Sequence, residues 1–230
     1  NTDLKKFKSY LLRRYHKEPM AYILGYKHFW KHKFLTNKSV LIPRPDTELI
    51  VEETLKHLPI DKSKKILDVG TGSGCIVVSL IKERPKCAAT AIDISRKALN
   101  VAKTNAKLHQ VENKIKFINI DIDKYKSSNY DLIISNPPYI NCIELNRLDD
   151  DIKLHEPKIA LSGGYDGFRD IKKVIIVSKK LLKLNGKLII EIGHKQKILS
   201  VKILKENGYY INKISKDLSG KDRCIISTKL

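Results

Sequence analysis

The chain has 230 residues, 42% of them hydrophobic, and a formal net charge of +20; this length accommodates one α/β domain plus a small appendage, and the composition excludes a disordered protein. It has no run of the roughly 20 apolar residues that a membrane-spanning helix needs and no basic start followed by an apolar secretory segment, so we expect a cytoplasmic protein. Because the lysines are spread along the whole sequence, the charge indicates a solvated surface more than a nucleic-acid site, although it permits an acidic or RNA-containing partner.

The N-terminal elements are predicted to be short. Residues 3–16 space their apolar side chains at helical intervals and predict an amphipathic helix. Pro19 ends this helix, and residues 20–25 predict one more helical turn that finishes at a glycine. Residues 28–42 carry aromatic and β-branched side chains around a polar turn at residues 36–39, a pattern typical of a hairpin or of paired short strands.

A proline-rich loop follows at residues 41–48, with the sequence Leu-Ile-Pro-Arg-Pro-Asp-Thr-Glu. Asp46 or Thr47 can cap a helix that we expect to continue to about Leu58. Arg44 lies between the two prolines and is therefore displayed on a stiff loop. It could meet a carboxylate or phosphate of a substrate, or equally form a plain surface salt bridge.

From residue 64 onward the sequence alternates between strand and helix patterns, which is the mark of a doubly wound parallel sheet. Seven strands are predicted, at residues 65–69, 88–93, 116–120, 130–135, 187–192, 209–215 and 223–228. Four helices are predicted between them, at residues 75–83, 95–108, 168–184 and 195–206. A composition shift over residues 59–64 divides the chain into an N-terminal part, residues 1–60, and a main domain, residues 61–230.

A glycine-rich turn follows the first of these strands. Glycines at a strand-to-helix turn let the backbone pass close to a ligand without a Cβ clash. The dinucleotide fingerprint needs a glycine at position 75, where this chain has Cys75, so that class of cofactor is not indicated. The residues of this candidate cofactor turn are Gly70, Thr71, Gly72, Ser73 and Gly74.

Two carboxylates follow the next two strands. Asp93 ends the second strand, 19 residues after Gly74, where a carboxylate can accept hydrogen bonds from both hydroxyls of a ribose. Asp121 follows the third strand. An ordinary loop carboxylate remains the alternative for Asp121, since Asp123 lies two residues away.

The fourth strand ends at Asn136-Pro137-Pro138-Tyr139. Two consecutive prolines must stop the strand, so Asn136 lies at its carboxyl edge, where open α/β sheets bind ligands. Prolines have no N–H, so the turn offers carbonyl acceptors without competing donors. Together with the Asn136 side-chain oxygen, they could hold a planar NH2 group while Tyr139 packs against its face. Taken alone, the four residues are equally consistent with a strand-ending turn that binds nothing.

These motifs resemble those of known methyltransferases. The Gly-x-Gly-x-Gly spacing resembles motif I of class I S-adenosylmethionine-dependent methyltransferases, and Asn-Pro-Pro-Tyr resembles the signature of enzymes that methylate glutamine side chains or adenine bases. Further stretches resemble one family closely, the peptide chain release factor glutamine N(5)-methyltransferases of the HemK/PrmC family. The stretches that carry the resemblance are residues 18–25, 41–48, 136–140 and 155–167.

The resemblance implies methyl transfer from S-adenosyl-L-methionine, leaving S-adenosyl-L-homocysteine, to the glutamine side chain in the Gly-Gly-Gln motif of release factors. It implies a class I methyltransferase sheet of seven strands whose last strand is antiparallel, preceded by a helical part and a hairpin. The N-terminal part of this chain is short for the family. By resemblance, Asp121 lies near the adenine amino group and Ile122 against the adenine face.

We assign roles around the acceptor amide from its chemistry. An amide nitrogen is a poor nucleophile, so alignment and acceptors for developing positive charge should dominate catalysis. Asn136 is expected to accept through its side chain and Pro137 through its carbonyl, with Tyr139 as a packing wall. Asn136 is also expected to contact the cofactor. Pro138 and Arg44 are expected to complete the substrate site.

Two other functions fit parts of the sequence. An adenine amino methyltransferase acting on DNA or RNA would need a region that holds an extruded base, and residues 141–168 are short for one. A methyltransferase fold that only binds is disfavoured because the glycine turn, Asp93 and Asn136 are intact. No metal is expected, since the four cysteines form no Cys-x-x-Cys pair and His28 and His32 lack an acidic partner nearby.

Overall fold

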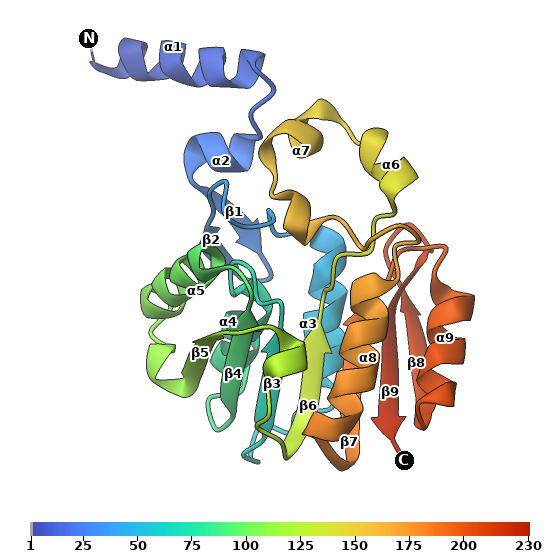
Figure 1. Cartoon of the computed structure of the whole chain (residues 1–230). Helices are drawn as coiled ribbons and strands as arrows, with labels where there is room; N and C mark the ends of the chain where they lie inside the picture. Colours follow the sequence, from blue (N-terminus) through green and yellow to red (C-terminus); the bar gives the residue numbers. More distant parts are fainter. Residues whose placement is uncertain (1) are drawn as a thin grey trace.

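A twisted sheet forms the centre of the molecule in the computed structural model, which describes residues 2–230 (Figure 1). The strands lie in the order β5-β4-β3-β6-β7-β9-β8. β9 is antiparallel to both of its neighbours, and the other strands run in one direction. The predicted doubly wound sheet of seven strands with an antiparallel last strand is confirmed. Its strands are β3 (Lys65–Val69), β4 (Ala88–Asp93), β5 (Ile115–Asn119), β6 (Tyr130–Ser135), β7 (Leu182–Glu191), β8 (Tyr209–Lys216) and β9 (Asp222–Lys229).

Helices cover both faces of this sheet. One face carries α3 (Glu48–Leu55), α4 (Cys75–Glu83) and α5 (Arg96–Leu108), and the other carries α8 (Arg169–Leu181) and α9 (Lys197–Glu206). Successive strand residues point to opposite faces, so Ile134 packs in the core under α3 and α4 while Ile133 packs under α8. Burial on both faces explains why β6 reads as an unbroken apolar run.

The N-terminal hairpin forms, but its turn lies elsewhere than predicted. β1 (Tyr26–Phe29) pairs with β2 (His32–Leu35) across Trp30 and Lys31, whereas the sequence pattern placed the turn at residues 36–39. Trp30 has a φ of 54°, and its backbone N–H donates to the Glu48 carboxylate at 2.8 Å. Its indole N–H donates to Glu83 at 3.0 Å. Contacts with α3 and α4 therefore fix a turn that local propensity does not indicate.

The helix after the proline-rich loop is shorter than expected and begins differently. A 3₁₀ turn, η1 (Pro45–Thr47), precedes α3, which ends at Leu55 rather than at Leu58. Thr47 is the residue before α3, but its side chain makes no capping hydrogen bond. The division of the chain at residue 60 stays a prediction; α3, which precedes it, packs on α4, β7 and β9 of the main sheet.

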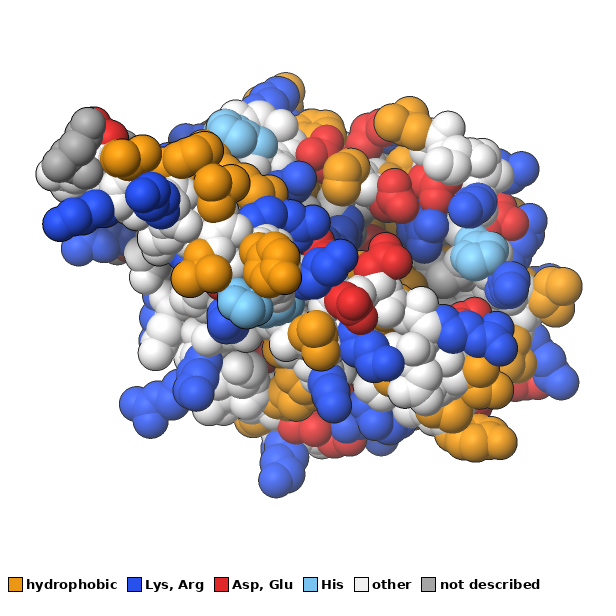
Figure 2. All heavy atoms as spheres, turned by 90° about the horizontal axis from the view of Figure 1, so that it is seen from above, with side chains coloured by type: hydrophobic (Ala, Val, Ile, Leu, Met, Phe, Trp, Pro, Cys, Tyr) orange, Lys and Arg blue, Asp and Glu red, His pale blue; other side chains and the backbone are white. Residues whose placement is uncertain are grey.

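The first helix, α1 (Thr2–Tyr15), confirms the predicted helix and leaves its apolar side exposed. No side chain between Thr2 and Tyr15 is buried, and Phe7 and Leu12 are 58% and 60% exposed. Figure 2 shows these apolar side chains in a row along α1. The short helix α2 (Met20–Leu24) follows and ends at Gly25, which has a φ of 82°.

Two short helices that the sequence pattern did not indicate, α6 (Cys142–Asn146) and α7 (Asp150–His155), lie above the carboxyl edge of the sheet (Figure 1). α7 is joined to the N-terminal part: Arg14 pairs with Asp151 at 2.5 Å, and the His155 ring bonds the His16 carbonyl at 3.0 Å. The remaining 3₁₀ turns are η2 (Glu112–Lys114), η3 (Ile122–Lys124) and η4 (Lys158–Ala160).

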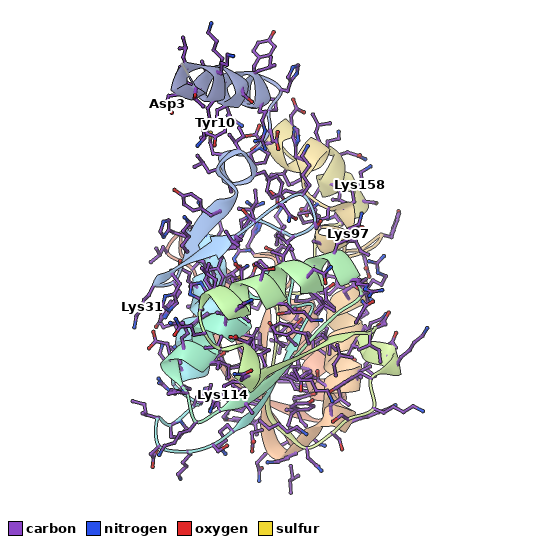
Figure 3. The ribbon with its side chains drawn as sticks, turned by 90° about the vertical axis from the view of Figure 1, so that its left-hand side faces the viewer. Asp3, Tyr10, Lys31, Lys97, Lys114 and Lys158 are labelled. Atoms are coloured by element: carbon purple, nitrogen blue, oxygen red, sulfur yellow. The ribbon has the colours of Figure 1, made fainter. Side chains whose placement is uncertain are left out.

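The positive charge is distributed over separate elements. Figure 3 labels lysines that lie far apart on one side of the molecule, among them Lys31 in the hairpin turn, Lys97 on α5 and Lys114 in η2. Between residues 2 and 230, no helix combines the length and the apolar content that crossing a membrane takes.

Candidate active site

The predicted site residues lie at the carboxyl ends of adjacent strands. Gly70 follows β3, Asp93 ends β4 and Asn136 follows β6, and these strands are neighbours in the order β4-β3-β6. A cavity of about 430 Å³ lies at this edge, a size within the range of small-molecule sites. Of the predicted residues, it is lined by Gly70, Gly72, Asp93, Asp121, Ile122, Asn136 and Pro138.

The glycine turn presents backbone to this cavity. Gly70 and Gly72 have φ values of 72° and 55°, and a Cβ on Gly70 would meet nothing within 4 Å. Gly74 has a different role, because a Cβ there would lie 3.1 Å from the Cβ of Ala102 on α5. Glycine at position 74 thus permits close helix packing, whereas Gly70 and Gly72 keep the cavity wall free of side chains.

Thr71 and Ser73 support the turn from behind and do not line the cavity. Both are buried. The Thr71 hydroxyl donates to Asp68 at 2.6 Å, and the Ser73 carbonyl accepts from Asn105 at 2.9 Å. Burial raises the pKa of Asp68 to about 7, with the Thr71 hydrogen bond opposing that rise. No motif in the sequence marks Asp68 as a site residue.

Asp93 is held by two backbone amides. Its Oδ2 accepts from the N–H of Gly72 at 2.9 Å, and its Oδ1 accepts from the N–H of Ser95 at 2.8 Å. Burial raises the pKa of Asp93 even though these bonds favour the ionised form. A carboxylate has about four acceptor sites, and the two backbone amides use two of them. Asp93 can therefore still accept hydrogen bonds from hydroxyl groups of a ligand in the cavity.

Asp121 is paired with a lysine that no sequence motif indicates. The Lys173 ammonium on α8 donates to both oxygens of Asp121, at 3.1 and 3.2 Å, and lies 2.7 Å from Asp123. Burial alone would raise the pKa of Asp121, but the Asp123 N–H and Lys173 lower it. Ile122 is 5% exposed and forms apolar wall of the cavity. Lys173 lies within a predicted helix, where no motif marked it.

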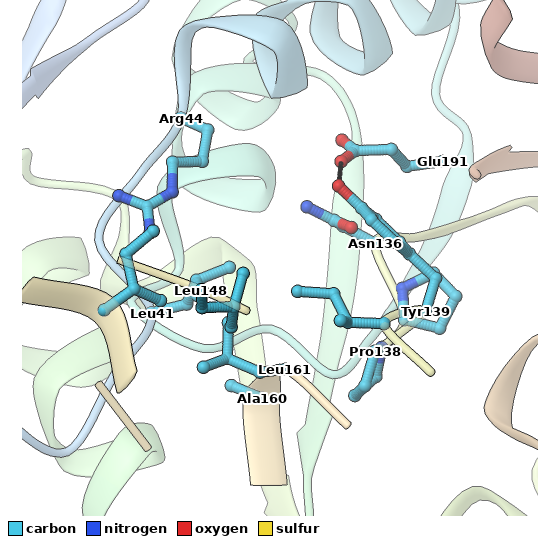
Figure 4. A pocket seen from close by; sticks show the side chains of 12 residues that line it. Leu41, Arg44, Asn136, Pro138, Tyr139, Leu148, Ala160, Leu161 and Glu191 are labelled. Carbon is cyan, nitrogen blue, oxygen red and sulfur yellow. Dashed lines mark hydrogen bonds between the residues drawn. The ribbon is translucent and has the colours of Figure 1, made fainter. Parts of the chain in front are cut away.

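A second, smaller cavity of about 120 Å³ adjoins the first (Figure 4). Leu41, Asn136 and Pro138 line both cavities, so the two are neighbours across the turn after β6. All four residues of the Asn-Pro-Pro-Tyr turn line the smaller cavity. The structure therefore brings the candidate acceptor residues and the candidate cofactor residues to one edge of the sheet.

Asn136 has a fixed orientation. Its Nδ2 donates to the Thr47 hydroxyl at 3.1 Å, which leaves Oδ1 as the free end of the amide. Among residues 2–230, no donor bonds Asn136 Oδ1 or the Pro137 carbonyl. These two oxygens can therefore accept hydrogen bonds from a bound NH2 group. Thr47 was considered in the sequence only as a helix cap.

Tyr139 contacts a buried glutamate. Its hydroxyl donates to Oε1 of Glu191 at 3.2 Å (Figure 4). Glu191 is the last residue of β7 and is 2% exposed. Burial raises the pKa of Glu191 to about 7, and the Thr47 hydroxyl and Arg223 oppose that rise. Glu191 was also missed, although an acidic residue at the carboxyl end of an apolar strand was a usable signal.

Arg44 forms an internal salt bridge. Its guanidinium pairs with Oε1 of Glu156, whose other oxygen accepts from the Ile42 N–H at 3.1 Å. The Glu156 side chain is 1% exposed, whereas the Arg44 side chain is 35% exposed and lines the smaller cavity. Of the two interpretations of Arg44 from sequence, the salt bridge is present, and the guanidinium still reaches the cavity wall.

Comparisons with known proteins give consistent matches. The family model "Methyltransferase small domain" matches residues 47–148. The chain is 40% identical over 228 residues to the release factor glutamine methyltransferase of Francisella tularensis, covering 96% of this chain and 78% of that relative. It is 37% identical over 252 residues to the bifunctional methyltransferase of Rickettsia felis, covering 97% of this chain. It covers 48% of the Rickettsia felis protein, so the chain spans about half the length of that relative.

A solved structure is also similar. It is the release factor-specific protein-(glutamine-N5) methyltransferase of Alicyclobacillus acidocaldarius, which is 27% identical with a TM-score of 0.50. The match covers 82% of this chain and 94% of that chain.

Proposed function

We propose, from the premise that this chain belongs to the release factor glutamine methyltransferase family, that it transfers a methyl group from S-adenosyl-L-methionine to a release factor. The acceptor is the side-chain amide of the glutamine in the Gly-Gly-Gln motif. One observation carries the proposal: a small pocket with free acceptor oxygens adjoins a larger cavity built on a glycine turn. Asn136 lines both, so a group in the small pocket faces a ligand in the larger one.

The residues of the larger cavity fit S-adenosyl-L-methionine. Gly70 and Gly72 leave backbone exposed for a long ligand, Asp93 retains acceptor sites for ribose hydroxyls, and Ile122 offers apolar surface for adenine. We propose that Asp121 accepts from the adenine amino group. The bound cofactor supplies an activated methyl group on a sulfonium. We propose that Thr71, Ser73 and Gly74 act indirectly, by shaping the turn.

The small pocket fits a primary amide. We propose that Oδ1 of Asn136 and the Pro137 carbonyl accept the two N–H groups, which fixes the nitrogen and favours positive charge as it develops there. The amide nitrogen takes the methyl group as the bond from the methyl carbon to sulfur breaks, which leaves the neutral thioether of S-adenosyl-L-homocysteine, and the nitrogen then gives one proton to solvent. Pro137 and Pro138 have no N–H, so no backbone donor of the turn competes for these oxygens. Tyr139 packs against the amide face. Arg44, held by Glu156, closes the pocket on the side away from Tyr139 (Figure 4).

We propose that this reaction takes place in the cytoplasm with release factors as the partners. All four cysteines are free, which suits a reducing compartment. Nucleic-acid binding is not required for the proposed transfer. The two-part organisation, with residues 1–60 as an N-terminal part and residues 61–230 as the methyltransferase domain, belongs to this proposal as well.

A labelled-methyl transfer assay tests the function. The chain is incubated with labelled S-adenosyl-L-methionine and, in parallel, with a release factor, with DNA and with RNA. Label on the release factor is the expected result. Label on nucleic acid alone would replace this function with an adenine amino methyltransferase, and no label on any acceptor would indicate an inactive binding module.

A further inference from the structure

Glu191 is a buried acidic side chain to which the proposed transfer assigns no role. It ends β7, the strand next to β6, and lines the small pocket together with Asn136 and Tyr139 (Figure 4). Glutamate is seldom this deeply buried unless it is paired. Its contacts therefore indicate what holds it there.

The carboxyl group of Glu191 is only half satisfied. Oε1 accepts from the Tyr139 hydroxyl at 3.2 Å. Oε2 is buried and has no hydrogen-bond partner within the described part of the chain. A hydrophobic residue at this position would avoid the free-energy cost of burying an oxygen that has no hydrogen-bond donor. Packing alone therefore does not explain why a glutamate lies beside the pocket.

The two polar residues of the turn have separate anchors. The Tyr139 hydroxyl is hydrogen-bonded directly to Glu191, whereas Nδ2 of Asn136 donates to the Thr47 hydroxyl at 3.1 Å. Tyr139 and Asn136 both belong to the turn that is proposed to hold the acceptor amide.

The charges around Glu191 leave it without a dedicated counter-ion. Arg223 on β9 faces it but donates to Asp217 at 2.9 Å and lies 3.5 Å from Asp46. The negative charge of Asp46 opposes ionisation of Glu191. Cys224 on β9 is the residue that pairs with Glu191 in the sheet. Burial then raises the pKa of Glu191 to about 7. Near neutral pH the group therefore changes between a neutral acid and a carboxylate.

We infer that Glu191 is a positioning residue for methyl transfer, which holds the Tyr139 ring beside the acceptor amide. The inference rests on the proposed function. An ionised carboxylate is a stronger acceptor for the Tyr139 hydroxyl than a neutral acid. The hydrogen bond that holds Tyr139 should therefore be stronger at a pH above the pKa of Glu191 than at a pH below it.

The variants Glu191→Ala, Tyr139→Phe and their combination test the inference. We expect Glu191→Ala to lower kcat for the release factor roughly 10- to 100-fold, the scale of a lost alignment, with little change in KM. Because the two residues act as a pair, the double variant should lose no more than the worse single variant. Binding of S-adenosyl-L-homocysteine, measured by calorimetry, should stay within about twofold of wild type because Glu191 does not line the larger cavity.

A conservative variant separates positioning from general stability. Glu191→Gln keeps an oxygen that can accept from Tyr139 but cannot ionise, so kcat should lose the rise with pH near 7 that we expect of the wild type. The Tyr139 ring signal in NMR of tyrosine-labelled protein should move with pH in the same range in the wild type and stay fixed in Glu191→Gln. Glu53→Gln is the matched control, since Glu53 is also buried but bonds Lys213 and Ser215 away from the pocket; it should leave kcat unchanged.

Failure of the inference and failure of the function give different results. If the wild type transfers no label to any release factor, the proposed function falls and this inference with it. If the wild type transfers label and Glu191→Ala keeps its kcat, only the inference falls. The inference would also be overturned if the losses of kcat in Glu191→Ala and Tyr139→Phe added up in the double variant. A rise of kcat with pH near 7 that persists in Glu191→Gln would overturn it as well.

Discussion

The side-chain amide of Asn136 donates to the hydroxyl of Thr47 at 3.1 Å, across 89 positions of sequence. This bond joins the turn after β6 to the start of α3 and decides which end of the Asn136 amide is free. With Nδ2 engaged, Oδ1 remains available as an acceptor. The orientation on which the proposed chemistry depends is therefore set by Thr47, the residue before α3.

Asn136→Ala should separate cofactor binding from transfer. Most cofactor contacts in the proposed site belong to other residues, so the affinity for S-adenosyl-L-homocysteine should change little. Transfer should fall by at least about 100-fold, the effect of removing one fixed polar group from the reacting centre. Calorimetry and single-turnover transfer measure the two effects, and turnover close to wild type would refute the role of Asn136.

Thr47→Val removes the hydroxyl that anchors Asn136 while keeping the side-chain volume. We expect kcat to fall about 10-fold, because the Asn136 amide can then rotate. Asn136 would still be present in the pocket, but its Oδ1 would no longer be aligned with the acceptor nitrogen. Thr47→Ser keeps the hydroxyl and serves as the control with nearly normal kcat. Equal kcat values for the valine and serine variants would show that the hydroxyl does not orient Asn136.

Gly74→Ala should destabilise the fold more than Gly25→Ala. Both glycines have left-handed backbone, with φ values of 79° and 82°, so each substitution costs about 1–2 kcal/mol from conformation alone. Only at Gly74 would the new Cβ meet a neighbour, 3.1 Å from the Cβ of Ala102. Urea unfolding compares the two free energies of unfolding, and equal losses would contradict close packing of α5 against the glycine turn.

Asp68→Asn should change how stability depends on pH. The folded pKa of Asp68 is raised from 3.8 to about 7 by burial, so the folded state binds the proton more tightly than the unfolded state. As the pH rises from about 4 to 7, this group therefore lowers the free energy of unfolding by about 1.4 kcal/mol for each pH unit. The asparagine variant should lack this fall and gain stability relative to wild type between pH 5 and pH 8. Urea unfolding at both pH values measures the gain, and a constant difference would contradict a raised pKa.

The fold was largely predictable because its strongest signals are local. Unbroken apolar runs, the glycine turn and the Pro-Pro break located the strands of the sheet and three strand ends that face the cavity. The predicted start of β7 was wrong, because β7 begins at Leu182, inside the helix predicted over residues 168–184. The hairpin turn at Trp30 was not predictable, since hydrogen bonds to Glu48 and Glu83 fix it. The short helix α7 was missed for a similar reason: its position depends on the pairing of Arg14 with Asp151.

The site was predictable where a motif carried the chemistry and not where a side chain acts through another. Asn136, Asp93 and the glycines were placed by strand order alone. Glu191 and Lys173 were overlooked, and Thr47 was considered only as a helix cap, because their contacts join distant segments and no spacing in the sequence links them. Thr47 contacts Asn136, Glu191 contacts Tyr139 and Lys173 contacts Asp121.

Mapping the transferred methyl group by mass spectrometry tests the central claim most directly. A release factor is incubated with the chain and S-adenosyl-L-methionine, digested and sequenced by fragmentation. The account predicts a single added methyl group on the side-chain nitrogen of the glutamine in the Gly-Gly-Gln motif, and none when that glutamine is replaced by alanine. A methyl group on another residue, or one that persists after the replacement, would contradict it.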